Sequence, residues 1–162
     1  MAWTDAPTAS WARPASGPAS TSGAPPADPA VVQDLLRDLL AAFYQAYLED
    51  ATEPRRRRMA ALLLQADQHG LLGPAAVQSL AVLFSSLVHE FALDPQKFAA
   101  FYHFFFFVSR DRGHRNLTDA TAVEGWRFLL GNGRFGLLEP WCAFVARRGV
   151  RGVSKGVSED TW

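Results

Sequence analysis

The sequence predicts an all-α fold, a compact domain of about six helices. Apolar residues recur at three- and four-residue spacing in successive segments, as on the buried face of an amphipathic helix. Helix-starting residues and glycines separate these segments, and no strand pattern is evident. The chain has 162 residues, 49% of them hydrophobic, and a formal net charge of zero. These values predict one domain with a tail.

Residues 1–27 differ in composition from the rest of the chain. They are rich in Ala, Ser, Thr, Pro and Gly and have almost no apolar repeat. Such a segment buries too little apolar surface to offset the entropy lost on ordering. We therefore expect a disordered leader, followed by a helical domain over residues 28–162. A transit peptide is the alternative, but the Arg-rich amphipathic pattern of those signals is missing.

Two helices are expected in the first part of the domain. Asp28-Pro29 is a helix start, because Asp accepts a backbone hydrogen bond and proline is preset for the first turn. Thr52-Glu53-Pro54 starts a second helix. The apolar face of the first helix is expected to pack in the domain and consists of Val32, Leu35, Leu36, Leu39, Leu40, Phe43 and Tyr47.

Four consecutive arginines, residues 55–58, lie in the second helix. A run of this kind could be a nuclear address or a phosphate-binding patch. More often it is one solvated turn of a helix. The balanced net charge argues against nucleic acid as a partner.

A third helix follows Gly73-Pro74, and a fourth starts at Asp94-Pro95. The fourth is apolar nearly all round from Phe98 to Val108, which is typical of a buried helix. A membrane span needs about 20 apolar residues, and this run is broken by His103. Gly113 is expected to close the fourth helix. The inward residues of the third helix are expected to be Val77, Leu80, Ala81, Phe84, Leu87, Val88 and Phe91.

Two more helices are expected toward the carboxyl end. Thr118 or Asp119 starts the fifth helix, and Gly131-Asn132-Gly133 ends it. Its buried stripe is expected to contain Ala122, Val123, Trp126, Leu129 and Leu130. The stripe of the sixth helix, which should end near Gly149, is expected to contain Leu137, Leu138, Trp141, Phe144 and Val145.

The sequence offers no persuasive catalytic or metal-binding set. Cys142 could act as a nucleophile with His103 or His114 as base, but a cysteine on an apolar helix stripe is usually inert. The four histidines share no metal-ligand spacing. Residues 67–70 lack the alternating oxygen ligands of a calcium loop. We predict a non-enzymatic protein without cofactor or metal, which binds other proteins and neither nucleic acid nor membrane.

The aromatic-rich stretch from Phe98 to Trp162 carries a distinctive motif series. It contains FYHFFFFVSRDRGHRNLTDATAVEGWRFLLGNGRFGLLEPWCAFV and, further on, SEDTW. This series resembles the potentiating-neddylation domain of the defective-in-cullin-neddylation family, and its SEDTW end is most similar to the plant antiauxin-resistance branch. The matching residues are Phe101, Tyr102, Phe104, Gly113, Leu117, Trp126, Gly133, Arg134, Phe135, Leu137, Leu138, Trp141, Cys142, Phe144, Asp160, Thr161 and Trp162.

The resemblance implies an accessory factor for cullin neddylation. Family members bind the carboxyl-terminal winged-helix region of a cullin together with the neddylation-conjugating E2. On the cullin side, Asp160 matches one member of the family's acidic patch. On the E2 side, Val108 and Phe128 match two residues lining the pocket for the acetylated amino terminus of the E2. Core packing is the competing interpretation of both, and Asp160 also suits the first turn of a helix. A location in nucleus and cytoplasm is implied as well.

Family members continue through several more helices beyond this motif series, whereas this sequence stops at Trp162. We therefore expect an incomplete domain over residues 28–162, with weakened cullin binding. Trp162 and the outer face of residues 137–148 are expected to lack cover, which would leave the domain marginally stable. The alternative is a helical interaction module, or a competitor that binds the E2 without promoting neddylation.

Overall fold

Six α-helices make up the fold in a computed structural model, which describes residues 28–150 and 155–162. The predicted disordered leader, residues 1–27, lies outside the described residues. The described part contains no strand, only one isolated antiparallel bridge. The all-helical prediction is therefore confirmed. The helices are α1 (Pro29–Tyr47), α2 (Glu53–Gln68), α3 (Ala76–Leu93), α4 (Pro95–Ser109), α5 (Asp119–Leu130) and α6 (Leu138–Val150).

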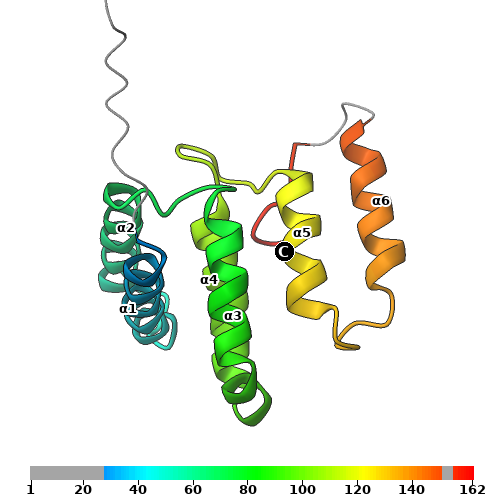
Figure 1. Cartoon of the computed structure of the whole chain (residues 1–162). Helices are drawn as coiled ribbons and strands as arrows, with labels where there is room; N and C mark the ends of the chain where they lie inside the picture. Colours follow the sequence, from blue (N-terminus) through cyan, green and yellow to red (C-terminus); the bar gives the residue numbers. More distant parts are fainter. Residues whose placement is uncertain (1–27, 151–154) are drawn as a thin grey trace, which may run out of the picture.

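The helices α3 and α4 form the centre of the molecule (Figure 1). The pair α1 and α2 packs on one side of them, and α5 and α6 lie on the other. Helix α4 contacts α1, α2, α3 and α5, whereas α6 packs against α5. The carboxyl-terminal residues return to lie beside α5 (Figure 1).

The starts of α1, α4 and α5 are set by local side-chain hydrogen bonds, whereas Thr52 precedes α2 as predicted but forms no such bond. The side chains of Asp28, Asp94 and Thr118 accept bonds from backbone N–H groups in the first turns of α1, α4 and α5, at 2.9, 3.0 and 3.2 Å. The N-cap of α5 is thus Thr118, which decides between the two predicted starts. Each cap satisfies donors that a helix amino terminus leaves without an intrahelical partner.

The core is built around the aromatic residues of α4. Phe101, Phe104 and Phe105 are fully buried, as expected of a helix that is apolar nearly all round. The ring of Phe101 lies 5.2 Å from that of Phe91 in α3, and the ring of Phe104 lies 5.4 Å from that of Phe43 in α1. These rings join three helices into one core.

Helix α3 is, among the described residues, long and apolar enough to cross a membrane by length and composition alone. The core helix of a globular domain meets the same criteria. Helix α3 packs against α1, α4 and α5, and its buried residues include Leu80, Leu83 and Phe84. These contacts fit a core helix.

Two details of α3 and α4 differ from expectation. In α3, Leu83 is buried and Val88 is 39% exposed, so the predicted inward position of Val88 is wrong. Helix α4 ends at Ser109, and Arg110 leaves it with extended backbone. Gly113 does adopt a positive φ of 78°, but it does so in the turn that follows. It shapes the loop rather than closing the helix.

The buried face of α6 also differs from the predicted stripe. Leu138, Cys142 and Val145 point inward, whereas Leu137 and Phe144 are 66% and 51% exposed. Both sets have helical spacing, and they occupy adjacent faces of the same helix. Because α6 packs against α5, only one of these two faces is covered.

Candidate protein-docking site

The carboxyl-terminal segment, residues 155–162, is fixed on α4 and α5. Leu117 and Val157 exchange two backbone hydrogen bonds of 2.9 and 2.8 Å, which form the isolated antiparallel bridge. Val157 is fully buried. The backbone N–H of Trp162 donates to the carbonyl of Ser158 at 2.9 Å, which closes a final turn. The segment is thus held at its start and at its end.

Trp162 anchors the end of this segment by stacking. Its ring lies nearly parallel to those of Phe105 and Trp126, with 5.2 Å between centroids in each pair. Its indole N–H donates to the backbone carbonyl of Tyr102 at 3.0 Å. The approach requires Gly125, because a Cβ there would lie 2.3 Å from Phe105 Cε1 and 3.0 Å from Trp162 Cη2. The expectation that Trp162 lacks cover is wrong, since it is half-buried against α4 and α5.

Asp160 lies in the final turn and is exposed. Its side chain forms no hydrogen bond or ion pair with another described residue. The anchored Trp162 two residues later holds the backbone of this turn in place. The predicted cullin-contact residue is therefore presented to solvent on a fixed segment, and its role stays a prediction.

Val108 and Phe128 lie in the core between helices. Val108 is fully buried, and its backbone carbonyl accepts a 2.9 Å bond from the N–H of Gly73. Phe128 is half-buried, with its ring 5.7 Å from that of Phe84 and 5.3 Å from that of Phe105. Both positions fit core packing, and the E2-contact role of each stays a prediction. Phe128 is the more accessible of the two.

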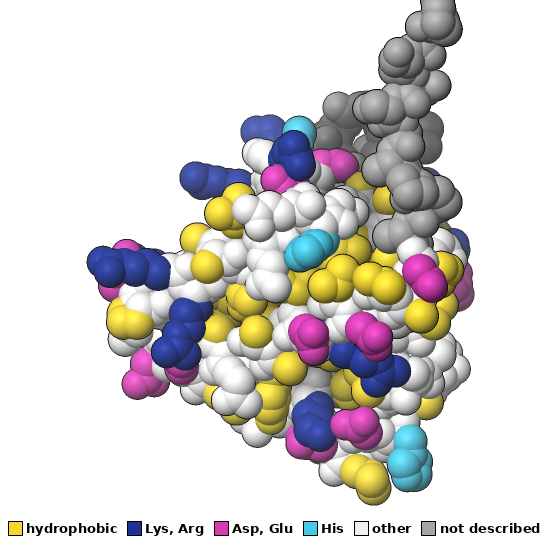
Figure 2. Space-filling view, turned by 60° about the vertical axis from the view of Figure 1, so that its left-hand side comes forward, with side chains coloured by type: hydrophobic (Ala, Val, Ile, Leu, Met, Phe, Trp, Pro, Cys, Tyr) yellow, Lys and Arg dark blue, Asp and Glu magenta, His cyan; other side chains and the backbone are white. Residues whose placement is uncertain are grey.

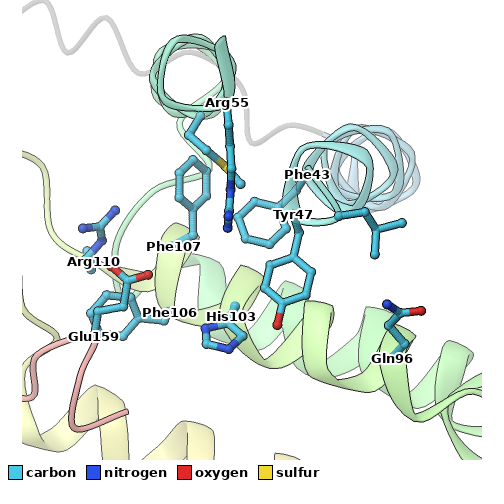
Figure 3. A pocket seen from close by; sticks show the side chains of 11 residues that line it. Phe43, Tyr47, Arg55, Gln96, His103, Phe106, Phe107, Arg110 and Glu159 are labelled. Carbon is cyan, nitrogen blue, oxygen red and sulfur yellow. The ribbon is translucent and has the colours of Figure 1, made fainter. Parts of the chain in front are cut away.

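A pocket of about 630 Å³ opens between α1, α2, α4 and the carboxyl-terminal segment. Figure 3 shows Arg110 and Glu159 together on one side of it, with Tyr47 and His103 opposite. We call it the arginine pocket. Its lining residues are Phe43, Tyr47, Leu48, Arg55, Met59, Gln96, His103, Phe106, Phe107, Arg110 and Glu159.

The arginine pocket carries an excess of positive charge. The guanidinium of Arg110 lies over the ring of Phe106 at 5.2 Å, and that of Arg55 lies over Tyr47 at 5.8 Å. Burial lowers the pKa of Arg110, and the carboxylate of Glu159 partly opposes this shift. Glu159 is the one acidic residue in the lining, against two arginines.

Sequence reasoning did not find this pocket. Its residues come from three helices and the carboxyl-terminal segment, so no local spacing brings them together. The one local signal was His103, which interrupts the apolar run of α4.

His103 should make the domain less stable as the solution becomes more acidic. Burial lowers the pKa of His103 below its ordinary value of 6.5, and the positive charge of Arg55 lowers it further. The negative charge of Glu159 raises the pKa but does not cancel these effects. The unfolded chain therefore takes up a proton at higher pH than the folded chain does. The free energy of unfolding should fall as the pH drops through 6.5 and level off below the folded-state pKa.

Urea titrations from about pH 7.5 to about pH 5 measure this effect. Replacing His103 with glutamine should flatten that part of the profile, whereas the same change at the exposed His89 should leave its slope unaltered. Identical slopes for the parent protein and His103→Gln would contradict the assignment.

The arginine run of residues 55–58 divides between two environments. Arg55 donates to the backbone carbonyl of Glu49 at 3.2 Å and faces the arginine pocket. Arg56 and Arg57 approach Glu53 at 3.7 and 3.4 Å, and Arg58 pairs with Glu49. Local acids thus balance most of the run, which fits the interpretation as one solvated helix turn.

Figure 2 shows hydrophobic side chains exposed on the side turned toward the viewer, among scattered charges of both signs. Such a surface suits a protein partner better than a polyanion.

Cys142 is poorly placed to act as a nucleophile. Cys142 is fully buried, and burial raises the pKa of its thiol, which disfavours the nucleophilic thiolate. The described ranges contain no group of three or more His, Cys, Asp and Glu side chains placed to hold a metal ion. What the described surface does offer is an exposed acidic turn and a basic pocket beside it.

Residues 79–162, slightly more than half of the chain, match the family described as cullin binding. Defective in cullin neddylation protein AAR3 from Arabidopsis thaliana is 37% identical over 73 residues, which cover 45% of this chain and 23% of that relative. The chain thus spans about a quarter of the length of this curated relative. No solved structure matches. The family match includes α4, α5, α6 and the segment with Asp160 and Trp162, and the chain belongs to the cullin-binding family.

Proposed function

We propose that this protein is a non-catalytic accessory factor in cullin neddylation. It binds the carboxyl-terminal winged-helix region of a cullin and the neddylation-conjugating E2, and it holds them close together. The match of residues 79–162 to the cullin-binding family carries this proposal. The name of the similar Arabidopsis protein, which refers to cullin neddylation, supports it. The same proposal places the protein in nucleus and cytoplasm.

Proximity is sufficient for such a role. Holding two reactants in a productive arrangement can lower a reaction barrier by roughly 7–11 kcal/mol without a reactive side chain. The protein then needs two docking surfaces and no catalytic group. A scaffold whose only cysteine is buried in α6 is compatible with that requirement.

On the cullin side, Asp160 supplies an exposed carboxylate on an anchored turn. One exposed charge pair contributes about 1 kcal/mol or less, because water screens it. Asp160 alone therefore gives weak cullin binding, and neighbouring residues must contribute to a firm complex.

On the E2 side, Phe128 is the better residue to test. It is half-buried, so its substitution can alter a surface contact. Val108 is fully buried, so an aspartate there would place an unpaired charge in the core and unfold the domain.

Two binding measurements test the proposal, one with a cullin winged-helix domain and one with an acetylated E2 amino-terminal peptide. Asp160→Asn should weaken cullin binding about fivefold or less and leave peptide binding unchanged. Phe128→Asp, provided that its circular dichroism spectrum shows it to be folded, should weaken peptide binding and leave cullin binding unchanged. Matched controls are Asp38→Asn, an exposed acid on α1, and Phe144→Asp, an exposed phenylalanine on α6.

The pattern of binding separates the alternatives. Binding of the peptide without the cullin would support a competitor that occupies the E2. Binding of neither would contradict the proposal and support a helical interaction module of another pathway. If both bind, the rate of cullin modification with and without the protein decides whether proximity is used.

A further inference from the structure

The arginine pocket is distinct from the residues assigned to cullin and E2. Asp160, Val108 and Phe128 do not line it. Its walls combine aromatic rings with two guanidinium groups, and its volume of about 630 Å³ lies within the usual range for ligand sites, roughly 300–1,000 Å³. It can therefore receive two or three side chains of a partner.

Arg110 is the least satisfied polar group of this pocket. It is half-buried, and its Nε is buried without a hydrogen-bond partner. Its guanidinium lies over the rings of Phe106 and Phe107, at 5.2 and 5.9 Å, and forms no ion pair with a described residue. A partly desolvated cation without a paired anion is unfavourable. A carboxylate from outside would relieve this cost.

We propose that the arginine pocket binds an acidic peptide segment of a partner protein. A carboxylate of the peptide pairs with Arg110, and an adjacent apolar or aromatic side chain packs against the half-buried rings of Tyr47 and Phe107. Arg55, which also lines the pocket, attracts a second acidic residue.

A peptide carboxylate fits the arginine pocket better than phosphate or a free anion does. The planar guanidinium pairs with a carboxylate through two parallel hydrogen bonds. The carboxylate of Glu159 at the pocket edge repels a doubly charged phosphate more strongly than a singly charged carboxylate. The exposed Leu48 and the half-buried rings of Tyr47 and Phe107 provide apolar surface that a free anion would leave unused.

Substitution of Glu159 should change the affinity for the peptide in the opposite direction from substitution of Arg110. Its charge raises the pKa of both His103 and Arg110, so its field reaches the groups that would meet the peptide. In the pocket it competes with an incoming carboxylate. Removing its charge should therefore strengthen binding, an effect that a purely structural role would not produce.

The test uses a peptide with fluorescein on its amino terminus, fluoresceinyl-Gly-Asp-Phe-Glu-Gly-amide, titrated by fluorescence polarisation with the full chain. Arg110→Gln should weaken binding about tenfold or more, and Glu159→Gln should strengthen it severalfold. Arg112→Gln is the matched control, because this exposed neighbour pairs with Asp67 outside the pocket and should have no effect. A peptide with Asn and Gln in place of Asp and Glu should bind at least tenfold more weakly.

Several outcomes would overturn the proposal. Equal binding of the charged and uncharged peptides would show that carboxylates are not recognised. Unchanged or weaker binding by Glu159→Gln would place the peptide elsewhere, even if Arg110→Gln proved unstable. Displacement of the peptide by about 1 mM inorganic phosphate would identify a phosphate site instead. None of these readouts uses a cullin or an E2, so they are independent of the function proposed above.

Discussion

Replacing Trp162 with alanine should lower the free energy of unfolding by about 3–5 kcal/mol, the usual cost of removing a large aromatic side chain from a packed site. The indole stacks on the rings of Phe105 and Trp126, and its N–H donates a hydrogen bond to the carbonyl of Tyr102. Its removal leaves an unfilled space beside Gly125, which has no side chain of its own to occupy it. Urea denaturation followed by circular dichroism would measure the loss.

Two further substitutions divide this effect into its parts. Trp162→Phe keeps an aromatic ring in the stack and loses the hydrogen bond, so about 1 kcal/mol should be lost from that bond. Leu137→Ala removes a side chain that is 66% exposed and should change stability by about 0.5 kcal/mol or less. If Trp162→Ala were no more destabilising than Leu137→Ala, the terminal segment would not be docked as described.

Trp162→Ala should also weaken binding at the acidic turn. Asp160 is presented by a turn whose end is fixed by Trp162. An unfixed turn must lose conformational entropy when it binds, at about 1–2 kcal/mol for each ordered residue. A larger loss of cullin affinity for Trp162→Ala than for Asp160→Asn would show that the anchor organises the surface.

Local features were predictable from the sequence because their causes are local. The caps Asp28, Asp94 and Thr118 bond to donors within three residues, so the helix starts could be predicted from residue type and order. The burial of α4 followed from an apolar pattern that covers nearly the whole helix, so its orientation did not matter.

The buried face of α6 was not predictable in the same way. Leu137 and Leu138 begin two adjacent apolar stripes with equally good helical spacing. The choice between them depends on where α5 lies, and spacing along one helix contains no such information. The exposed stripe, with Phe144, is the consequence of that choice.

The docking site, too, was predictable from the sequence only in part. Asp160 was singled out by the family resemblance, but its exposure depends on the return of residues 155–162 to α4 and α5. That return depends on Leu117, forty residues earlier in the chain, and on rings from two helices. The arginine pocket combines residues from segments even further apart, so only the folded chain shows it.

Gly156→Ala should detach the carboxyl-terminal segment at its other end. Gly156 has a φ of 82°, and a Cβ there would lie 2.3 Å from the backbone oxygen of Leu117. That oxygen accepts the hydrogen bond from Val157, so the backbone cannot move away without breaking the bridge. The strain of the left-handed conformation costs about 1–2 kcal/mol, and the steric conflict adds about 1–3 kcal/mol.

Gly133→Ala separates these two contributions. Gly133 has a similar φ of 76°, but no atom lies within 4 Å of a Cβ built there. It should therefore show the backbone strain alone, about 1–2 kcal/mol. Hydrogen exchange at the amides of Leu117 and Val157 should accelerate in Gly156→Ala and stay slow in Gly133→Ala, because only the first change opposes the bridge. Equal exchange rates in the two variants would mean that the Leu117–Val157 bridge accommodates the alanine side chain at residue 156 without opening. The position of Asp160 would then depend on the ring stack of Trp162 alone.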